Sequence, residues 1–255
     1  KLKYLLYKIN ENEKDFLKLD LKGVLPRPQY ALGLFLSANI ASQLGYKKIS
    51  VIEFGCWEGE GLLDLEHYSE DIERLFNLKI EIYGFEGGEG LPKPKDYKDR
   101  VYQFTAGEMK LSKNSCIKKL KKSKIIYGNF QDTVTNFIEK GNFAPIAALF
   151  NDADYFFSTQ ESLKILCQKN KLPKVFLYFD DLNFSSSLTG ELGAINDFNL
   201  NNKSKIETIP ELAETMSMFW KKWSFLGKRF FIHHDFNHEK YNIRYENPLY
   251  KNLRF

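Results

Sequence analysis

Cysteine is scarce in this 255-residue chain. Cys56, Cys116 and Cys167 lie far apart and form neither a CxxC pair nor a Cys/His cluster. An odd number of widely spaced cysteines argues against a disulfide framework and against structural zinc, so a reducing cytoplasm is the expected compartment. The sequence also lacks any apolar run near the roughly 20 residues that a membrane-spanning helix needs. We therefore expect no membrane span.

A strong excess of charge of one sign is also missing. The chain has 37 Lys and Arg against 33 Asp and Glu, a formal net charge of +4. A nucleic-acid-binding protein identified from composition alone should show a stronger basic excess. No internal repeat or low-complexity linker divides the sequence. Its length suits one large α/β domain with a substantial core better than two small domains.

Short apolar runs alternate with segments of helical periodicity through most of the chain. The pattern predicts strands at 49–54, 79–85, 124–127, 145–150 and 174–179, and helices at 30–44, 62–76, 133–139, 158–168 and 190–199. This alternation favours a mostly parallel sheet covered by helices on both faces. The connection 86–123 should hold a loop and at least one helix. Segments 229–233 and 241–245 are expected as late strands that can run antiparallel.

Acidic and glycine-rich groups follow four of the five expected parallel strands. The glycine-bearing turn 55–61 follows the first strand, Glu86 the second, 152–154 the fourth, and the pair Asp180-Asp181 the fifth. In sheets of this kind, ligands bind beyond the carboxyl ends of the strands. We therefore expect the functional site at this edge.

The turn after the first strand carries Gly55, Gly59 and Gly61, which let the backbone pass close to a ligand. Its spacing is not GxGxxG, it has no Lys-Ser/Thr, and its acids Glu58 and Glu60 would repel a pyrophosphate. A cofactor with a positive or zwitterionic end suits it better, and an ordinary tight strand–helix turn is the alternative.

Glu86 stands about 30 residues further on. A carboxylate at that place can accept hydrogen bonds from both hydroxyls of a ribose. A solvated loop carboxylate would occupy the same position, and both interpretations stay open at this point.

Asp152, Asp154, Asp180 and Asp181 form the sharpest constellation, because two neighbouring strand ends would bring four carboxylates together. Such like charges raise each other's pKa and cost stability. A bound hard divalent cation such as Mg²⁺, Mn²⁺ or Ca²⁺ removes the conflict, and oxygen-only ligands favour these ions over zinc. The cation would lower the pKa of a substrate hydroxyl, and a spare carboxylate would take the proton. Acidic loops without a metal are the alternative.

Two further clusters favour structural interpretations. Seven lysines fall between positions 110 and 124, interleaved with apolar residues; a solvated helix face is favoured over a nucleic-acid or anionic-surface patch. The group His233, His234, Asp235 and His238 is better explained as a strand end near the surface than as a metal site.

Five segments resemble, in order, motifs of the macrocin O-methyltransferase family, class I S-adenosylmethionine-dependent enzymes that include sugar O-methyltransferases of the novobiocin and mycinamicin pathways. The segments are 52–61 (IEFGCWEGEG), 84–92 (GFEGGEGLP), 128–133 (GNFQDT), 152–159 (DADYFFST) and 180–181 (DD). The resemblance covers about residues 50 to 200. It implies a single domain with the Rossmann-like class I methyltransferase fold. In this domain, a helical N-terminal extension (1–46) and a cofactor- and metal-binding core (47–200) precede C-terminal strands (201–255) that complete the sheet.

The resemblance also implies roles for individual residues. The methionine end of S-adenosylmethionine would be held by Glu53 and the backbone at Gly55, Trp57, Gly59 and Gly61, the ribose by Glu86, and the adenine by Asn129 and Phe130. Asp152, which would also contact the cofactor, would bind Mg²⁺ or another hard divalent cation together with Asp180 and Asp181. Asp154 would be the general base.

The leading hypothesis is therefore methyl transfer to a hydroxyl of a sugar or of a glycosylated small molecule. Phe156 and Phe157 stand where the family has Tyr and Glu, so the acceptor side departs from the family pattern. A protein that binds the cofactor without transferring methyl groups is one alternative. A nucleic-acid methyltransferase is another, disfavoured because no N/D-P-P-Y/F motif is present. Whether the protein forms a homo-oligomer stays open.

Overall fold

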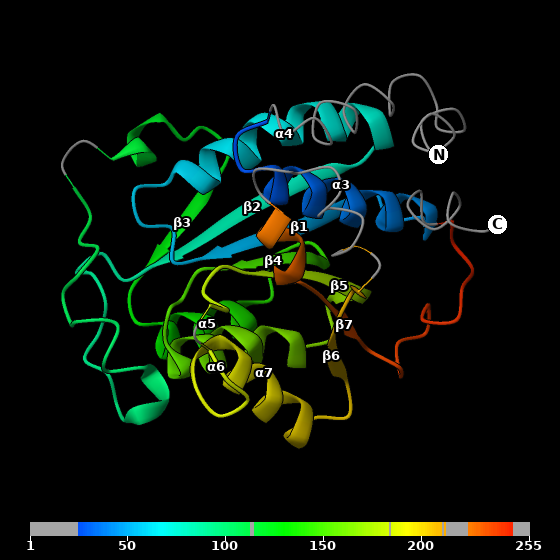
Figure 1. The fold of residues 1–255 in the computed structure, drawn as a ribbon. Helices are drawn as coiled ribbons and strands as arrows, with labels where there is room; N and C mark the ends of the chain where they lie inside the picture. Colours follow the sequence, from blue (N-terminus) through cyan, green and yellow to red (C-terminus); the bar gives the residue numbers. More distant parts are fainter. Residues whose placement is uncertain (1–24, 113–114, 184, 211, 213–223, 247–255) are drawn as a thin grey trace.

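The computed structural model describes residues 25–112, 115–183, 185–210, 212 and 224–246. Its centre is a seven-stranded sheet with the strand order β3-β2-β1-β4-β5-β7-β6. Helices α3 and α4 cover one face, and α5, α6 and α7 cover the other (Figure 1). The outer parts of the expected N-terminal extension and C-terminal region, 1–24 and 247–255, lie outside the described residues.

The strands match the predicted mostly parallel arrangement. Strands β1 to β5 pair in parallel, whereas β7 runs antiparallel to both β5 and β6. Their bounds are Lys48–Phe54 (β1), Lys79–Glu86 (β2), Lys124–Tyr127 (β3), Ile146–Asn151 (β4), Lys171–Phe179 (β5), Lys205–Thr208 (β6) and Phe230–His234 (β7). The prediction of an α/β sheet covered on both faces is confirmed.

Each helix can be traced to its sequence. The bounds are Pro28–Gln43 (α3), Glu60–Phe76 (α4), Phe130–Lys140 (α5), Phe156–Leu163 (α6) and Gly190–Asn201 (α7). α3 begins with a proline, whose missing N–H costs nothing in the first turn, and it is buried along almost its whole length. α5 begins at Asn129, whose side chain accepts from the Gln131 N–H at 3.0 Å, and ends at Gly141 in the left-handed region.

The core lies between the sheet and these two helical layers. Strand β4 is buried at every residue and β1 at all but its first, as expected for central parallel strands with both faces covered. Aromatic rings fill the space on both sides; for example, Phe54 stacks on Phe85 at 4.7 Å between ring centroids. In the part of the chain that the structure describes, no helix combines the length and the apolar character of a membrane span.

The connection between β2 and β3 differs from the prediction. Its described residues hold only two short 3-10 turns, Tyr97–Asp99 and Cys116–Lys119, instead of a helix. The backbone N–H groups of Lys121, Lys122 and Ser123 all donate to the Glu66 carboxylate of α4, at 2.7–3.1 Å, so they are not available to helical carbonyls. The predicted lysine-rich helix face is therefore wrong over the described residues; Lys113 lies outside them.

The C-terminal elements also differ. Segment 241–245 forms no strand; the Tyr241 N–H donates to the His238 carbonyl at 2.9 Å, in a turn that follows β7. The edge place in the sheet is taken by β6, which is only four residues long and buries just Ile206. The expected helix 158–168 is divided into α6 and a 3-10 turn at Lys164–Cys167.

Candidate functional site

A cavity of about 550 Å³ opens at the carboxyl edge of the sheet, within the size range of small-molecule sites. Its walls come from the ends of β1, β2 and β4, the start of α5 and the long β2–β3 connection, which passes this edge (Figure 1). Among the predicted site residues, those that line it are Gly55, Trp57, Glu86, Asn129, Phe130, Asp152 and Asp154. Those that do not line it are Glu53, Gly59, Gly61, Asp180 and Asp181.

The glycine turn 55–61 packs closely against neighbouring protein atoms. Gly55 has a φ of +79°, and a Cβ there would lie 1.8 Å from the backbone oxygen of Asp152. A Cβ on Gly61 would lie 2.0 Å from Oε1 of Glu53. Packing within the protein therefore requires these two glycines, whether or not a ligand approaches the turn.

Glu53 is buried at the end of β1, directly before this turn. The Tyr30 hydroxyl donates to its Oε1 at 2.8 Å, whereas its Oε2 is buried without a hydrogen-bond partner among the described residues. Burial raises the pKa of Glu53 to about 8. An orphaned buried carboxylate oxygen of this kind is suited to a cationic partner.

Glu86 connects the loops that follow β1 and β2. Its two carboxylate oxygens accept from the backbone N–H groups of Trp57, at 2.7 Å, and Gly88, at 2.8 Å. Each carboxylate oxygen can accept more than one hydrogen bond, so these contacts leave capacity for ligand hydroxyls.

The start of α5 gives the cavity an apolar wall. The ring of Phe130 lies edge-on to Phe54 and Phe85, with centroid distances of 5.4 and 6.5 Å. Asn129, beside it, uses its side-chain oxygen to cap α5. An aromatic side chain in such a wall can pack against an apolar or flat group of a ligand.

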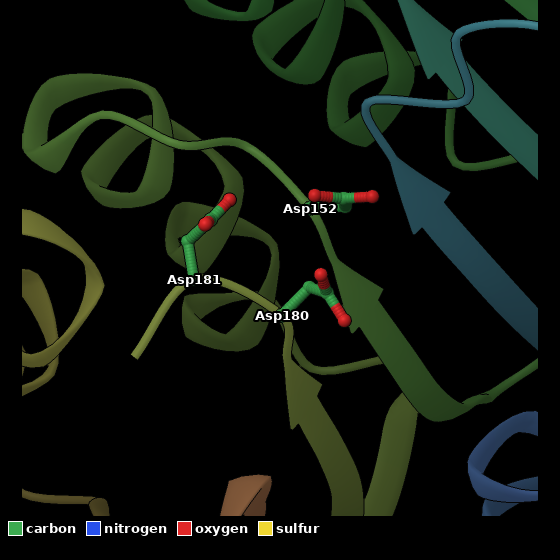
Figure 2. A group of neighbouring side chains, drawn as sticks. All are labelled: Asp152, Asp180 and Asp181. Carbon is green, nitrogen blue, oxygen red and sulfur yellow. The ribbon is translucent and has the colours of Figure 1, made fainter. Parts of the chain in front are cut away.

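Three of the four predicted acids can share one ligand site beside the cavity. Asp152 follows β4, and Asp180 and Asp181 follow the neighbouring strand β5. Each of the three can offer one carboxylate oxygen within 4.8 Å of the others (Figure 2). Burial and the charge of Asp180 raise the pKa of Asp152 well above its usual range. The parallel pairing of β4 with β5 produces this convergence.

Arg229 partly neutralises the cluster. Oδ1 of Asp180 accepts from the Tyr178 hydroxyl at 2.7 Å and from the Arg229 guanidinium at 2.9 Å. Arg229 directly precedes the antiparallel strand β7, so it reaches the edge at which the parallel strands end.

Asp154 takes a different place from the other three acids. It is buried, has a φ of +58°, and its carboxyl group is hydrogen-bonded to Asp181. Burial and this bond to a second acid raise the pKa of Asp154 to about 9. Without a cation, Asp154 therefore holds a proton at neutral pH.

Arg100 belongs to the site, although the sequence analysis did not identify it. Its side chain is fully buried and donates to the backbone oxygens of Asp154, at 2.7 Å, and Asn183, at 2.9 Å. Its guanidinium also lies 4.9 Å from the ring centroid of Phe104. It joins the β2–β3 connection to the loops after β4 and β5. No sequence signal distinguishes this arginine from the other basic residues of a long polar loop.

Glu191 also belongs to the site and was also missed. It is buried in the first turn of α7 and accepts from the side-chain amide of Asn151 at 2.9 Å and from the Asp181 N–H at 2.7 Å. Burial and the charge of Asp181 raise its pKa to about 8. An acid in the first turn of a predicted helix is a signal that could have found it.

Comparisons with known proteins add the fold relationship. No protein-family model and no curated protein sequence matches the chain. Among solved structures, the calicheamicin methyltransferase CalS11 is 19% identical over 82% of this chain and 85% of its own, with a TM-score of 0.51. The O-methyltransferase NovP is 14% identical over 71% and 75%, with a TM-score of 0.49, and an O-methyltransferase from Bacillus cereus is 14% identical over 89% and 91%, with a TM-score of 0.39.

The likeness establishes the fold. The seven-stranded, mostly parallel sheet with an antiparallel β6–β7 pair is that of the class I methyltransferases. The predicted fold class is therefore confirmed, and the structure is similar to S-adenosylmethionine-dependent O-methyltransferases at low sequence identity. Function does not follow from a fold, so it has to be argued from the site.

Proposed function

We propose that this protein is an S-adenosylmethionine-dependent O-methyltransferase that uses Mg²⁺, or another hard divalent cation, to methylate a hydroxyl of a sugar or of a glycosylated small molecule. One observation carries the proposal: three converging aspartates, Asp152, Asp180 and Asp181, adjoin a cavity that is also lined by the glycine turn and a ribose-type acid. A methyltransferase of this type needs a cofactor site and a metal site side by side.

The residues present fit the cofactor. The orphaned Oε2 of Glu53 would accept from the cofactor's α-amino group, and the charge of that group would favour the ionised carboxylate. The turn at Gly55, Trp57, Gly59 and Gly61 would hold the same end through its backbone, with Asp152 beside it. The ribose would lie at Glu86. Asn129 and Phe130 would lie against the adenine.

The residues present also fit a hard cation. Asp152, Asp180 and Asp181 offer only oxygen ligands, which Mg²⁺ prefers. When bound, the cation would polarise the acceptor hydroxyl and lower its pKa. Arg229 would then share Asp180 with the ion through its contact to Oδ1.

Asp154 is the proposed general base. It lies within hydrogen-bond distance of Asp181, and a positive charge near Asp181 would lower the pKa of Asp154 toward neutrality, the range in which a base works best. The bond from Arg100 to the Asp154 backbone oxygen holds this residue in its left-handed conformation. The remaining task is to hold the acceptor oxygen in line with the methyl group, which is a matter of positioning.

The test measures transfer of a labelled methyl group to a panel of sugars and glycosides, together with calorimetric binding of S-adenosylhomocysteine. Asp154→Asn should lower the rate by about 10²–10⁴-fold while leaving cofactor affinity nearly unchanged, because only the proton acceptor is lost. EDTA should stop transfer, and Mg²⁺ should restore it. Asp197→Asn serves as the matched control, because this half-buried acid of α7 does not line the cavity. A normal rate for Asp154→Asn would contradict the assignment of Asp154 as the general base. A rate that EDTA leaves unchanged would contradict the proposed role of the cation.

A protein that binds the cofactor without transferring methyl groups is the second candidate. The ion pair between Asp180 and Arg229 favours it, since a guanidinium already occupies part of the acid cluster. Binding of S-adenosylhomocysteine with no product from any acceptor would support this candidate. A nucleic-acid methyltransferase has less support, because Lys122 of the basic run is bound to Glu73 at 2.6 Å and to Ser69 at 2.9 Å.

A further inference from the structure

The far end of the cavity is not used by the proposed cofactor contacts. Beyond Asp154, the wall is formed by the β2–β3 connection and the start of α6, where Lys93, Lys95, Asp99 and Phe157 line the space. We propose that this end binds an anionic group of the acceptor, a phosphate or a carboxylate, through Lys93 and Lys95. The inference rests on the proposed function, because it treats this end of the cavity as the acceptor side.

Lysines cover the two phenylalanines at which the chain departs from the family pattern. The Lys95 ammonium lies 4.6 Å from the ring centroid of Phe157, and the Lys98 ammonium lies 4.7 Å from that of Phe156. A ring face supports a cation without neutralising its charge. The wall is therefore apolar at its base and positive above it.

These lysines have no acidic partner of their own. No carboxylate of the described chain lies within 4.0 Å of the ammonium groups of Lys93, Lys95 or Lys98. Other lysines of the same connection are paired: Lys110 lies 3.9 Å from Glu89, and Lys122 lies 2.6 Å from Glu73. Lys93, Lys95 and Lys98 therefore lie close together in the chain, and none of them has an acidic partner among the described residues.

Two acids that line the cavity together with these lysines are engaged elsewhere. Asp99 is buried and accepts from the backbone N–H groups of Lys95, at 2.8 Å, and Phe157, at 3.0 Å. Glu161, also on the cavity wall, pairs with Lys164 at 2.5 Å. Asp99 therefore anchors the connection to α6 through backbone N–H groups and forms no ion pair with Lys93 or Lys95, which both line the cavity.

This arrangement selects a class of acceptor. A phosphate or carboxylate attached near an apolar or ring-shaped group would pair with the lysines while that group packs against Phe157. An acceptor with an amino group at the same place would meet uncompensated positive charge. A sugar phosphate and a sugar acid both have the required chemistry.

The experiment compares three probes that share a ring and differ in charge: glucose 1-phosphate, glucuronate and methyl α-glucoside. Binding is followed by ligand-observed NMR with EDTA present, so that no cation bridges the probe to the aspartates. At least one anionic probe should bind more tightly than the neutral glucoside. Lys93→Gln with Lys95→Gln should weaken that binding about tenfold, the effect of removing two exposed ion pairs. Rising salt should weaken it as well.

The control is Lys140→Gln with Lys169→Gln, which removes two exposed lysines at the opposite edge, near the end of α5 and the start of β5. It should leave all three affinities unchanged. Preference for the phosphate identifies a phosphorylated acceptor, and preference for glucuronate identifies a sugar acid. Equal binding of the three probes, or no effect of Lys93→Gln with Lys95→Gln, overturns the inference. S-adenosylhomocysteine binding, measured in parallel, tests the proposed function separately.

Discussion

At the scale of single residues, the site depends on buried charges that bond to backbone groups. Arg100 is the strongest case, because its guanidinium reaches two loops that follow different strands. A fork with several donors can satisfy both carbonyls at once, whereas a lysine ammonium is a single point on a flexible stem. The conformation of Asp154 therefore depends on a residue more than 50 positions earlier in the chain.

Replacing this arginine should reveal that dependence. Arg100→Lys should lower the free energy of unfolding by about 1–3 kcal/mol, because at least one buried carbonyl loses its donor. Urea denaturation measures the change. Arg74→Lys on the exposed side of α4 is the control and should stay within about 0.5 kcal/mol of the parent protein. An Arg100→Lys protein as stable as the parent would show that Arg100 does not hold these loops.

At the scale of elements, one carboxylate of α4, that of Glu66, accepts from three backbone N–H groups of the β2–β3 connection. Burial raises the pKa of Glu66, but the hydrogen bonds from the backbone N–H groups of Lys121, Ser123 and Lys122 outweigh burial, and the pKa is lowered overall. Because the folded-state pKa lies below the unfolded value, this stabilisation is present above that unfolded value. It is lost as the pH falls through the folded-state pKa.

Glu66→Gln tests this attachment. An amide places an N–H₂ where the carboxylate accepts from a backbone N–H, so the free energy of unfolding should fall by about 1–2 kcal/mol. Amide hydrogen exchange at residues 121–123 should become faster. Glu70→Gln, on the exposed face of the same helix, should change neither measurement. Unchanged exchange in Glu66→Gln would mean that the turn is held by other contacts.

Elements with strong periodicity or a buried apolar run could be predicted from the sequence, and elements fixed by single contacts could not. The runs that became β1, β4 and β5 are apolar enough to require burial on both faces, and the glycines and acids that follow them indicated the edge at which the site forms. Segment 205–208 has one buried residue, so its place beside β7 depends on pairing, not on its own pattern. The 241–245 segment has aromatic and β-branched residues of a strand, yet it continues the turn after β7 and pairs with no strand among the described residues.

Some contacts between side chains could not be predicted from the sequence either. The spacing of Asp152, Asp180 and Asp181 predicted their convergence, since adjacent parallel strands end together. The Asp180–Arg229 pair could not be predicted, because it depends on the direction of β7. The sequence predicted that Asp154 would lie near Asp181, but it did not indicate the left-handed backbone conformation of Asp154.

At the scale of the whole molecule, a buried acid at the sheet edge should make stability depend on pH. The pKa of Glu53, raised to about 8 by burial, lies above its unfolded value near 4.5. The folded state therefore holds this proton more tightly than the unfolded state. Its contribution to stability is complete below about pH 4.5 and is lost as the pH rises through 8.

In EDTA, the free energy of unfolding of the parent protein should fall as the pH rises from 5.5 to 7.5. This fall should be larger than that of Glu53→Gln by an amount on the order of 1–3 kcal/mol. Chemical denaturation at several pH values measures how the free energy of unfolding depends on pH in each of the two proteins. The substitution keeps an oxygen to accept from Tyr30, so the comparison isolates the ionisation. Parallel slopes would show that Glu53 titrates as it does in the unfolded chain.

The reversed direction of β7 has a consequence for synthesis. The chain emerges from the ribosome amino end first, so β4 and β5, with Asp152, Asp180 and Asp181, exist before Arg229 is made. A nascent chain that has reached residue 210 carries the acids without their guanidinium. Such an intermediate should rely on dissolved divalent ions more than the finished protein does. The proposed cation would then matter for biogenesis as well as for the proposed catalysis.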